Sequence, residues 1–340
     1  MRSKFAALCL AGATAMTPFI ATAETLIFGT ANPEQAPINT QIMTPWAEKV
    51  NAEANGAVNI ELRHGRMMVN ATNFVDRLTD DVVQLVFGML VFDPGRFPRS
   101  LVSTTPFIEG SAEAAAIAFC SLYESGAFDE EYAGLVPLYF IPFPQSSAHL
   151  NGSELTSLNN LEGKKIMVGS PIQAQIVSAF GGTPLSINLP DQYQALQRGT
   201  ADGNFMTFTA FPAFRLNEVT TNHLELPLGG ATGMVFMERA RYDALSDEAR
   251  AVLDANSGCA VTRDVGTKVD KWQEGSKGFV MSNGDHTISQ IDQAELDAAR
   301  ANIAPGIYAG FSERVPGGAA LLEQWQAAME AARTETGEAK

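Results

Sequence analysis

The sequence predicts an α/β protein of two lobes, and three observations lead to this fold class. Strand-like apolar runs alternate with amphipathic helical segments between residue 25 and about residue 240, which is the pattern of parallel sheets covered by helices. From residue 240 onward the pattern is mostly helical. The chain, about 317 residues long once a leader is removed, also exceeds what one hydrophobic core usually organises.

The first half of the chain is expected to alternate strand and helix. Residues 25–30 form a strand-like apolar run. A helix follows to about residue 54, because Trp46 and Val50 lie on one face at a spacing of four and Gly56 stands just beyond its end. The further elements are, in order, a strand at 58–62, a helix at 73–79, a buried parallel strand at 82–87, a helix at 112–124 and a buried strand at 135–143.

The alternation repeats in the second half before helices take over. A strand ends near residue 168, a helix over 172–180 is followed by Gly181-Gly182, and the Asp202-Gly203 turn leads into residues 204–208. The other expected elements are, in order, a strand at 185–188, a helix at 191–198, a strand at 233–237 that residues 223–228 approach, and helices at 240–256, about 259–279, 292–307 and 317–333.

Residues 1–23 have the features of a secretory signal. Arg2 and Lys4 precede an apolar run over residues 6–16, and Ala21-Thr22-Ala23 provides small residues for cleavage. The apolar run is shorter than the roughly 20 residues of a spanning helix, and no later segment reaches that length. We therefore expect an exported protein located in the periplasm.

The charge of the chain argues against two classes of partner. Without the signal, 21 basic residues face 38 acidic ones, a net charge of −17. Nucleic acids and anionic lipid surfaces are bound through clustered Lys and Arg that neutralise phosphate, so neither nucleic acid nor direct lipid binding is expected. The acidity itself is typical of a soluble secreted surface and identifies no ligand.

Two cysteines remain after the signal, Cys120 in the helical segment 112–124 and Cys259 at the start of a later helix. An exported chain with two cysteines favours a disulfide, and two separately buried thiols are the alternative. Neither cysteine stands in a pattern typical of a nucleophile.

A search for catalytic patterns finds none. The four histidines are scattered without metal-ligand spacing: His64, His149, His223 and His286. The sequence contains no metalloprotease, nucleophile-elbow or phosphate-loop motif, so we expect no enzyme activity, no cofactor and no metal. The alternative is an exported hydrolase or lyase whose site is built from distant residues, since such a site escapes a motif search. A secreted scaffold without a ligand is a third possibility.

Several segments together carry a family resemblance. Residues 189–203 read LPDQYQALQRGTADG, residues 161–166 read LEGKKI, and residues 245–255 read LSDEARAVLDA. In this order, after an export signal, they resemble the periplasmic solute-binding proteins of TRAP transporters, the DctP-like family. The resemblance covers roughly residues 24–330.

The resemblance implies a fold and a function. It implies the two-lobed fold of periplasmic binding proteins, with crossing hinge strands and a long C-terminal helix packed across both lobes. Residues 24–146 with about 232–276 are then the first lobe, residues 147–231 with about 277–333 the second, and 334–340 a tail. It also implies that a small organic molecule binds between the lobes, that closure traps it, and that TRAP membrane permease subunits receive it.

The chain departs from the family where most members hold a carboxylate. The position directly after the K-I pair, where an arginine is usual, is Met167. A second frequent arginine, near residues 145–147, is missing. A frequent asparagine falls at Met206, with Asn204 two residues earlier as a substitute. From the first lobe, Phe87 and Met89 are expected to reach the ligand, and Phe208 is expected to join them.

Two interpretations of the ligand remain open. Methionines and aromatic rings line apolar pockets, which favours a ligand that is aromatic, neutral or cationic rather than the usual carboxylate. In the other interpretation Met167 only packs beneath its strand, and Arg66 or Arg96 supplies the cation. A third is a binding protein that has lost or changed its ligand. Glu34, in the loop 31–37, and His149 complete the candidate binding residues, although His149 also fits a hydrogen-bonded residue of the hinge.

Overall fold

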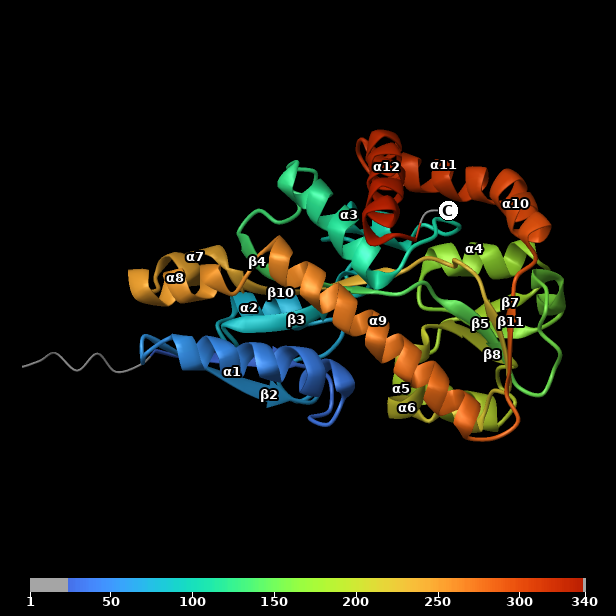
Figure 1. Cartoon of the computed structure of the whole chain (residues 1–340), viewed down its shortest axis with the longest axis horizontal. Helices are drawn as coiled ribbons and strands as arrows, with labels where there is room; N and C mark the ends of the chain where they lie inside the picture. The colour runs from blue at the N-terminus through green and yellow to red at the C-terminus, as the bar shows by residue number, and fades with distance from the viewer. Residues whose placement is uncertain (1–23, 339–340) are drawn as a thin grey trace, which may run out of the picture.

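The computed structural model of the protein describes residues 24–338, and it contains two β-sheets covered by helices (Figure 1). The first sheet has the strand order β2-β1-β3-β10-β4, and the second has the order β11-β9-β5-β8-β6-β7. The expected signal at residues 1–23 lies outside the described residues. Among those described, no helix combines the length and the apolar character that a membrane crossing requires.

The first sheet is built mainly from the first half of the chain. Its core on one face lies beneath α1, α8 and α9, and its core on the other face lies beneath α2, α3 and α12. The strands and early helices are β1 (Glu24–Thr30), α1 (Thr44–Glu53), β2 (Val58–His64), α2 (Phe74–Thr79), β3 (Leu85–Met89), α3 (Ala112–Glu124), β4 (Leu135–Phe143) and β10 (Ala231–Glu238).

The second sheet is formed by short strands. Its elements are β5 (Ser147–Leu150), β6 (Lys165–Met167), α4 (Pro171–Ala179), β7 (Thr183–Leu185), α5 (Leu189–Gln197), β8 (Gly203–Met206), α6 (Phe211–Phe214), β9 (Asn222–Glu225) and β11 (Thr287–Gln290). The pattern did not predict β11, because its sequence TISQ carries no apolar run and it forms only through parallel pairing with β9.

The expectation of purely parallel sheets is wrong. In the first sheet β10 runs antiparallel to both β3 and β4, and in the second β5 runs antiparallel to both β8 and β9. Both exceptions are strands next to the two crossings between the sheets, where the chain enters one sheet directly from the other without a helix. A connection of this kind does not require the helical crossover that a parallel neighbour needs.

The C-terminal region differs from the expected helices in two places. Its helices are α7 (Arg239–Asp243), α8 (Asp247–Ala255), α9 (Cys259–Ser282), α10 (Gln293–Asn302), α11 (Ala304–Arg314) and α12 (Gly318–Thr336). The helix expected at 240–256 is two helices, because Ser246 caps a new start by accepting a hydrogen bond from the amide of Ala249. The helix expected at 292–307 breaks at Ile303, and Pro305 stands in the first turn of α11.

The helix that spans both sheets is α9, which runs diagonally across the front of Figure 1. On the side of the first sheet its Asp270 carboxylate accepts hydrogen bonds from the amides of Ala112 and Glu113, at 2.8 and 2.9 Å. On the side of the second sheet its Gln273 side chain accepts from the amide of Thr209 at 3.0 Å. Helix α9 therefore holds elements of both halves.

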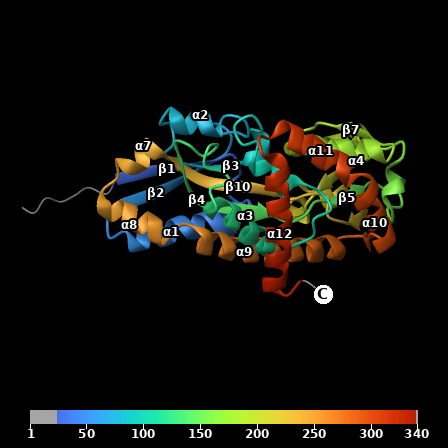
Figure 2. The same cartoon turned by 90° about the horizontal axis from the view of Figure 1, so that it is seen from above.

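The long C-terminal helix, α12, does not have that bridging role. Its buried residues belong to the core of the first sheet, where it packs beside α3 (Figure 2). The resemblance implied that about residues 277–333 belong to the second lobe and that this helix packs across both lobes, whereas the buried residues of α12 lie in the core of the first sheet. A disulfide joins Cys120 in α3 to Cys259 at the start of α9, with a Cα–Cα distance of 5.7 Å.

Two short segments without a helix connect the sheets, residues 144–146 between β4 and β5 and residues 226–230 between β9 and β10, and the chain crosses once more through α9 on its way from β10 to β11. They are bonded to each other, since the amide of Ser146 donates to the carbonyl of Gly229 at 3.0 Å and the amide of Gly229 donates to Oε1 of Gln145 at 2.9 Å. Gly229 has φ +88°, and a Cβ there would lie 2.2 Å from the carbonyl oxygen of Thr104. Only glycine fits this crossing.

Candidate functional site

The strand ends of both sheets meet the crossing segments, and this edge is the candidate site. Strands β3 and β4 both run antiparallel to β10, so the end of β3 at Met89 lies at the same edge as Phe143, which leads into a crossing. Strand β8 runs antiparallel to β5, so it ends at Met206 beside the other end of that crossing, and its parallel neighbour β6 ends at Met167. In α/β proteins, ligands bind beyond the carboxyl ends of strands.

The first sheet contributes apolar side chains to this edge. Phe87 is buried and Met89 is half-buried at the end of β3. Both lie against Gly233 of β10, where a Cβ would meet the Phe87 ring at 2.5 Å and the Met89 sulfur at 3.2 Å. Glycine at this position therefore makes room for the two side chains that the sequence predicted there.

The second sheet contributes a row of buried residues that are neighbours across the strands. Met167 pairs with Asn204, Asn204 pairs with His149, and His149 pairs with His223. Directly opposite residues of adjacent strands project from the same face, so the four side chains form one line. Each of the four has an exposed fraction of 0 %. Phe208 and Phe211 cover this line from the segment after β8.

Asn204 lacks a full set of hydrogen-bond partners. Its Nδ2 donates to Oε1 of Gln192, on α5, at 2.9 Å. Its Oδ1 is buried and has no partner among the described residues. An unmet buried acceptor costs about 1–3 kcal/mol, so a donor group from a bound molecule would be stabilised here. Helix α5, which begins with the LPDQ segment, thus places the side-chain amide of Gln192 beside Asn204. Asn204 is the residue expected to substitute for the asparagine that is frequent in the family.

His149 is hydrogen-bonded on both ring nitrogens. Its Nε2 lies 3.0 Å from the carbonyl oxygen of Met206, and its Nδ1 lies 2.8 Å from Nδ1 of His223. Burial lowers the pKa of His149 to about 4, although the bond to Met206 opposes the shift. Burial, together with the neighbouring His149 and His286 rings, lowers the pKa of His223 to about 2. Both buried rings are therefore neutral at neutral pH.

The cation nearest to this row comes from α9 and was not foreseen. Lys277 Nζ lies 6.0 Å from the centroid of the Phe208 ring. Two carboxylates already bind it, Glu225 at 2.5 Å and Glu274 at 2.8 Å. Burial tends to lower the pKa of Lys277, but the hydrogen bonds to these carboxylates outweigh it and the pKa is raised. Together the three side chains carry a net charge of −1, so they offer no positive charge for an acid.

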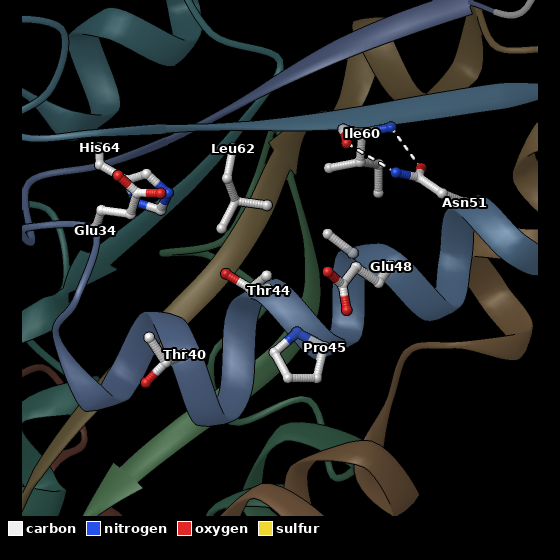
Figure 3. A pocket seen from close by; sticks show the side chains of 10 residues that line it. Glu34, Thr40, Thr44, Pro45, Glu48, Asn51, Ile60, Leu62 and His64 are labelled. Atoms are coloured by element: carbon white, nitrogen blue, oxygen red, sulfur yellow. Dashed lines mark hydrogen bonds between the residues drawn. The ribbon is translucent and has the colours of Figure 1, made fainter.

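The other binding residues expected from the sequence, Glu34, Arg66 and Arg96, lie on segments between the strands and helices of the first half of the chain. Glu34 and His64 line a hollow of about 430 Å³ between α1 and the edge strand β2 (Figure 3). In that hollow Asn51 covers the strand edge, because its side chain bonds both the amide and the carbonyl of Ile60, at 2.6 and 2.9 Å. Glu34 is thus placed with α1 and β2 and not with the row on the second sheet.

Neither candidate arginine is tied to the row. Arg66 is exposed in the loop after β2. Arg96 is half-buried, and its guanidinium lies 5.9 Å from the centroid of the Phe97 ring. Among residues 24–338, neither side chain forms a salt bridge, and the buried Nε of Arg96 has no hydrogen-bond partner.

The structure therefore gathers some of the predicted residues and separates others. It aligns Met167, Asn204 and His149 beneath Phe208 and attaches the Met206 carbonyl to them, while Glu34, Arg66 and Arg96 lie on other segments. It adds residues that the sequence gave no reason to choose: Gln192, His223, Phe211, Lys277 and His286. Strand register was the missing information. In the described part of the chain, no group of acidic, histidine or cysteine side chains is arranged to hold a metal ion.

Comparison with known proteins gives one consistent result. Residues 28–313 match the model of a family described as bacterial extracellular solute-binding protein, family 7. A TRAP solute-binding protein from a marine metagenome, specific for aromatic acid ligands and crystallised with 3-hydroxybenzoate, is 25 % identical. Its TM-score is 0.84, and the match covers 92 % of this chain and 99 % of that one.

Two curated relatives have similar coverage. The outer membrane transporter protein TsaT of Comamonas testosteroni is 22 % identical over 294 residues, which is 81 % of this chain and 85 % of that protein. The ectoine-binding periplasmic protein TeaA of Halomonas elongata is 20 % identical over 297 residues, which is 85 % of this chain and 86 % of that protein.

Proposed function

Because this chain belongs to the bacterial extracellular solute-binding proteins of family 7, we propose that it is the solute-binding subunit of a TRAP uptake system in the periplasm. The membership confirms the resemblance drawn from the sequence. The protein is an extracytoplasmic receptor for small ligands and not an enzyme, so the alternative of an exported hydrolase or lyase is wrong. Delivery of the ligand to membrane permease subunits is part of the proposal.

We propose further that the ligand is less anionic than the carboxylates that most members of the family bind. The observation that carries this is the uncharged row Met167–Asn204–His149, in which a thioether occupies the usual place of an arginine. A carboxylate buried beside such groups would lose its hydration without gaining a cation. Lys277 does not replace that cation, because Glu225 and Glu274 already neutralise it.

An aromatic ligand with a neutral polar substituent fits the residues at the edge. Phe87 and Phe208 are buried and Met89 is half-buried at this edge, so a ligand that enters between the sheets would meet apolar and aromatic side chains, which favours ring packing. The Oδ1 of Asn204 lacks a donor, which favours a hydroxyl or amide group on the ligand. The similarity to a receptor specific for aromatic acids supports the aromatic part of the proposal.

Capture of the ligand would depend on the two short connections between the sheets. Residues 144–146 and 226–230 are bonded to each other, so small backbone rotations there would turn one sheet relative to the other. Closure is stabilised only by contacts that a ligand makes in the closed form, and the apolar ends of β3 on one side and residues 206–208 on the other would make them.

The test compares two ligands of the same shape, one a neutral amide that also donates hydrogen bonds and the other a carboxylate anion that only accepts them. We expect isothermal titration of the mature protein to show that 3-hydroxybenzamide binds at least tenfold more tightly than 3-hydroxybenzoate, because only the anion lacks a counter-charge. Met167→Arg should reverse this preference, since guanidinium binds carboxylate through two hydrogen bonds. Met167→Leu is the matched control and should keep the preference for the amide.

One result would overturn the ligand proposal. If 3-hydroxybenzoate binds more tightly and Arg66→Ala or Arg96→Ala removes that binding, one of these arginines supplies the cation. Mass spectrometry of small molecules released from denatured protein then identifies the natural ligand. Turnover of any ligand that binds would contradict the receptor function, because a receptor returns its ligand unchanged.

A further inference from the structure

Three histidines far apart in the sequence form one hydrogen-bond chain through the second sheet. Nδ1 of His149 lies 2.8 Å from Nδ1 of His223, and Nε2 of His223 lies 3.1 Å from Nδ1 of His286. Both ends of the chain are backbone carbonyls. Met206 O lies 3.0 Å from Nε2 of His149, and Asn283 O lies 3.3 Å from Nε2 of His286.

The contact with Met206 fixes the position of the proton on His149. A carbonyl oxygen only accepts, so Nε2 of His149 carries a proton and donates it. Each contact between two ring nitrogens needs one proton, because two bare nitrogens repel and two N–H groups cannot bond to each other. The direction of the bonds between the rings therefore depends on the protonation of His149 and His223.

Burial fixes the protons of the two buried rings. His149 and His223 are fully buried, and burial favours the neutral form of each, which carries one ring proton. Nδ1 of His149 is then bare and accepts from Nδ1 of His223. Nε2 of His223 is bare in turn and accepts from Nδ1 of His286, which lies partly buried in the turn between α9 and β11. The direction of the bonds between the rings therefore follows from the Met206 carbonyl and from burial.

Among the described residues, the charged groups around the chain form no salt bridge with its two buried rings. The rings of Phe208 and Phe211 cover His149 and His223 from the segment after β8. Helix α9 contributes Lys277 above Phe208, already paired with Glu274 on the same helix and with Glu225 on β9. Asp285 is the chain neighbour of His286 and is exposed.

We propose that His149, His223 and His286 are positioning residues that hold the Met206 carbonyl, and with it residues 206–208, through a hydrogen-bond chain in which His286 is the first donor and the Met206 carbonyl is the last acceptor. The proposal rests on the proposed function only in taking residues 206–208 as part of the ligand site. The direction of the chain does not depend on any ligand, so it can be tested on the ligand-free protein.

The chain predicts which tautomer each buried ring adopts. Long-range ¹H–¹⁵N correlation spectra of the mature, ligand-free protein should show His149 in the Nε2–H form and His223 in the Nδ1–H form. The second assignment is the sharper one, because Nε2–H is the commoner tautomer of a neutral imidazole in water. Spectra that show His223 as Nε2–H, or as a rapidly exchanging mixture of both forms, would overturn the proposal.

Substitutions at His286 test whether that residue supports the Met206 carbonyl through the chain. His286→Asn retains a donor near the position of Nδ1, so it should leave the ring ¹⁵N signals of His149 and His223 and the amide signal of Thr207, which follows the Met206 carbonyl, close to their wild-type positions. His286→Ala removes the donor, so the Nε2 signal of His223 and the amide signal of Thr207 should shift, while the Met206 carbonyl still keeps both buried rings in their tautomers. His64→Ala, in the hollow beside β2, is the control and should change none of these signals. An unchanged Thr207 amide signal in His286→Ala would contradict the proposal.

The effect on binding separates this proposal from the proposed function. With 3-hydroxybenzamide as the probe, His286→Ala should weaken affinity by about three- to tenfold, as expected for loss of one ordered hydrogen bond, and His286→Asn should restore it. If the tautomers are as assigned but the probe does not bind, the histidine hydrogen-bond chain is supported and the proposed ligand class is contradicted. If the probe binds and His223 is Nε2–H, the proposed function is supported and the histidine hydrogen-bond chain is contradicted.

Discussion

The two sheets bring different chemistry to the edge where their strands end. On the first sheet, the charged candidates Arg66 and Glu34 stand on loops and are exposed, and Arg96 is half-buried. On the second sheet, Met167, Asn204 and His149 stand on strands and are wholly buried in one row. Residues on loops can change without disturbing a fold, whereas residues in a strand row are set by their neighbours. In the candidate site, the second sheet therefore contributes the side chains whose neighbours are set by strand register.

The halves also differ in what stabilises them. The first sheet is tied to α9 by the Cys120–Cys259 disulfide, which closes a long loop. The second sheet has no disulfide among the described residues and depends on a buried line of neutral polar side chains, including His149 and His223. The first half should therefore respond to reduction, and the second half should respond to acid.

The largest effect should come from removing the disulfide. We expect the double variant Cys120→Ala, Cys259→Ala to lose about 2–5 kcal/mol of unfolding free energy, because the unfolded chain is no longer cross-linked. Urea denaturation measures the loss. Hydrogen exchange should place the loosening in α3 and the start of α9, and equal loosening of β5 and β8 would remove the contrast between the two halves.

Acid should destabilise the second sheet selectively. The pKa of His149 falls from 6.5 in the unfolded chain to about 4 in the folded one. Between these values only the unfolded chain gains a proton, so stability is present above pH 6.5 and is lost as the pH falls toward 4. The shift corresponds to about 3 kcal/mol for His149, and His223 acts in the same direction.

The measurement for this prediction is thermal unfolding as a function of pH. His149→Gln keeps a donor near the position of Nε2 but does not titrate, so its melting temperature should fall less between pH 6.5 and pH 4 than that of the wild type. An identical pH profile in both proteins would show that the buried histidines do not cause the acid sensitivity.

A smaller effect should come from the crossing that joins the halves. Gly229→Ala places a Cβ 2.2 Å from the carbonyl oxygen of Thr104 at a positive φ, so we expect a loss of about 2–3 kcal/mol. Gly199→Ala is the matched control, because Gly199 has φ +68° but nothing within 4 Å of its Cβ position. It should cost about 1 kcal/mol. Equal losses in the two variants would mean that the close approach to Thr104 is unimportant.

The smallest effects should come from the loop arginines of the first sheet. Arg66→Ala and Arg96→Ala should change the affinity for a neutral aromatic amide by less than about twofold, because a neutral ligand carries no charge that either guanidinium could neutralise. Titration calorimetry with 3-hydroxybenzamide measures this. A tenfold loss in either variant would move the polar part of the site to the first sheet.

Much of the fold follows from local sequence patterns. The helix at 112–124 and the strand at 135–143 are found as expected, because an uninterrupted apolar pattern and clear end signals define each of them. Errors occur where tertiary contacts decide. The strand β3 begins at Leu85 and not at Val82, whose side chain is 37 % exposed, and the polar β11 exists only because β9 offers an edge.

The site was predicted less completely than the fold. Met167, Asn204 and Phe208 were named because family motifs place them near strand ends, and each of them lies in the row or over it. In the sequence the histidines are scattered, because no motif or regular spacing relates His149 to His223 or His286. Their alignment depends on the pairing of β5 with β9 and on the turn before β11.

The α/β class, most of the helices and strands and the family resemblance can be predicted from periodicity, end signals and motif spacing, which are properties of neighbouring residues. The same motifs place Met167 where the resemblance implies an arginine. The sequence names Cys120 and Cys259 as a possible pair and leaves open whether they are bonded, and it gives no sign of the bridging role of α9 or of the chain of three histidines. Strand register and helix packing join residues distant along the chain, and local patterns do not specify which strands become neighbours.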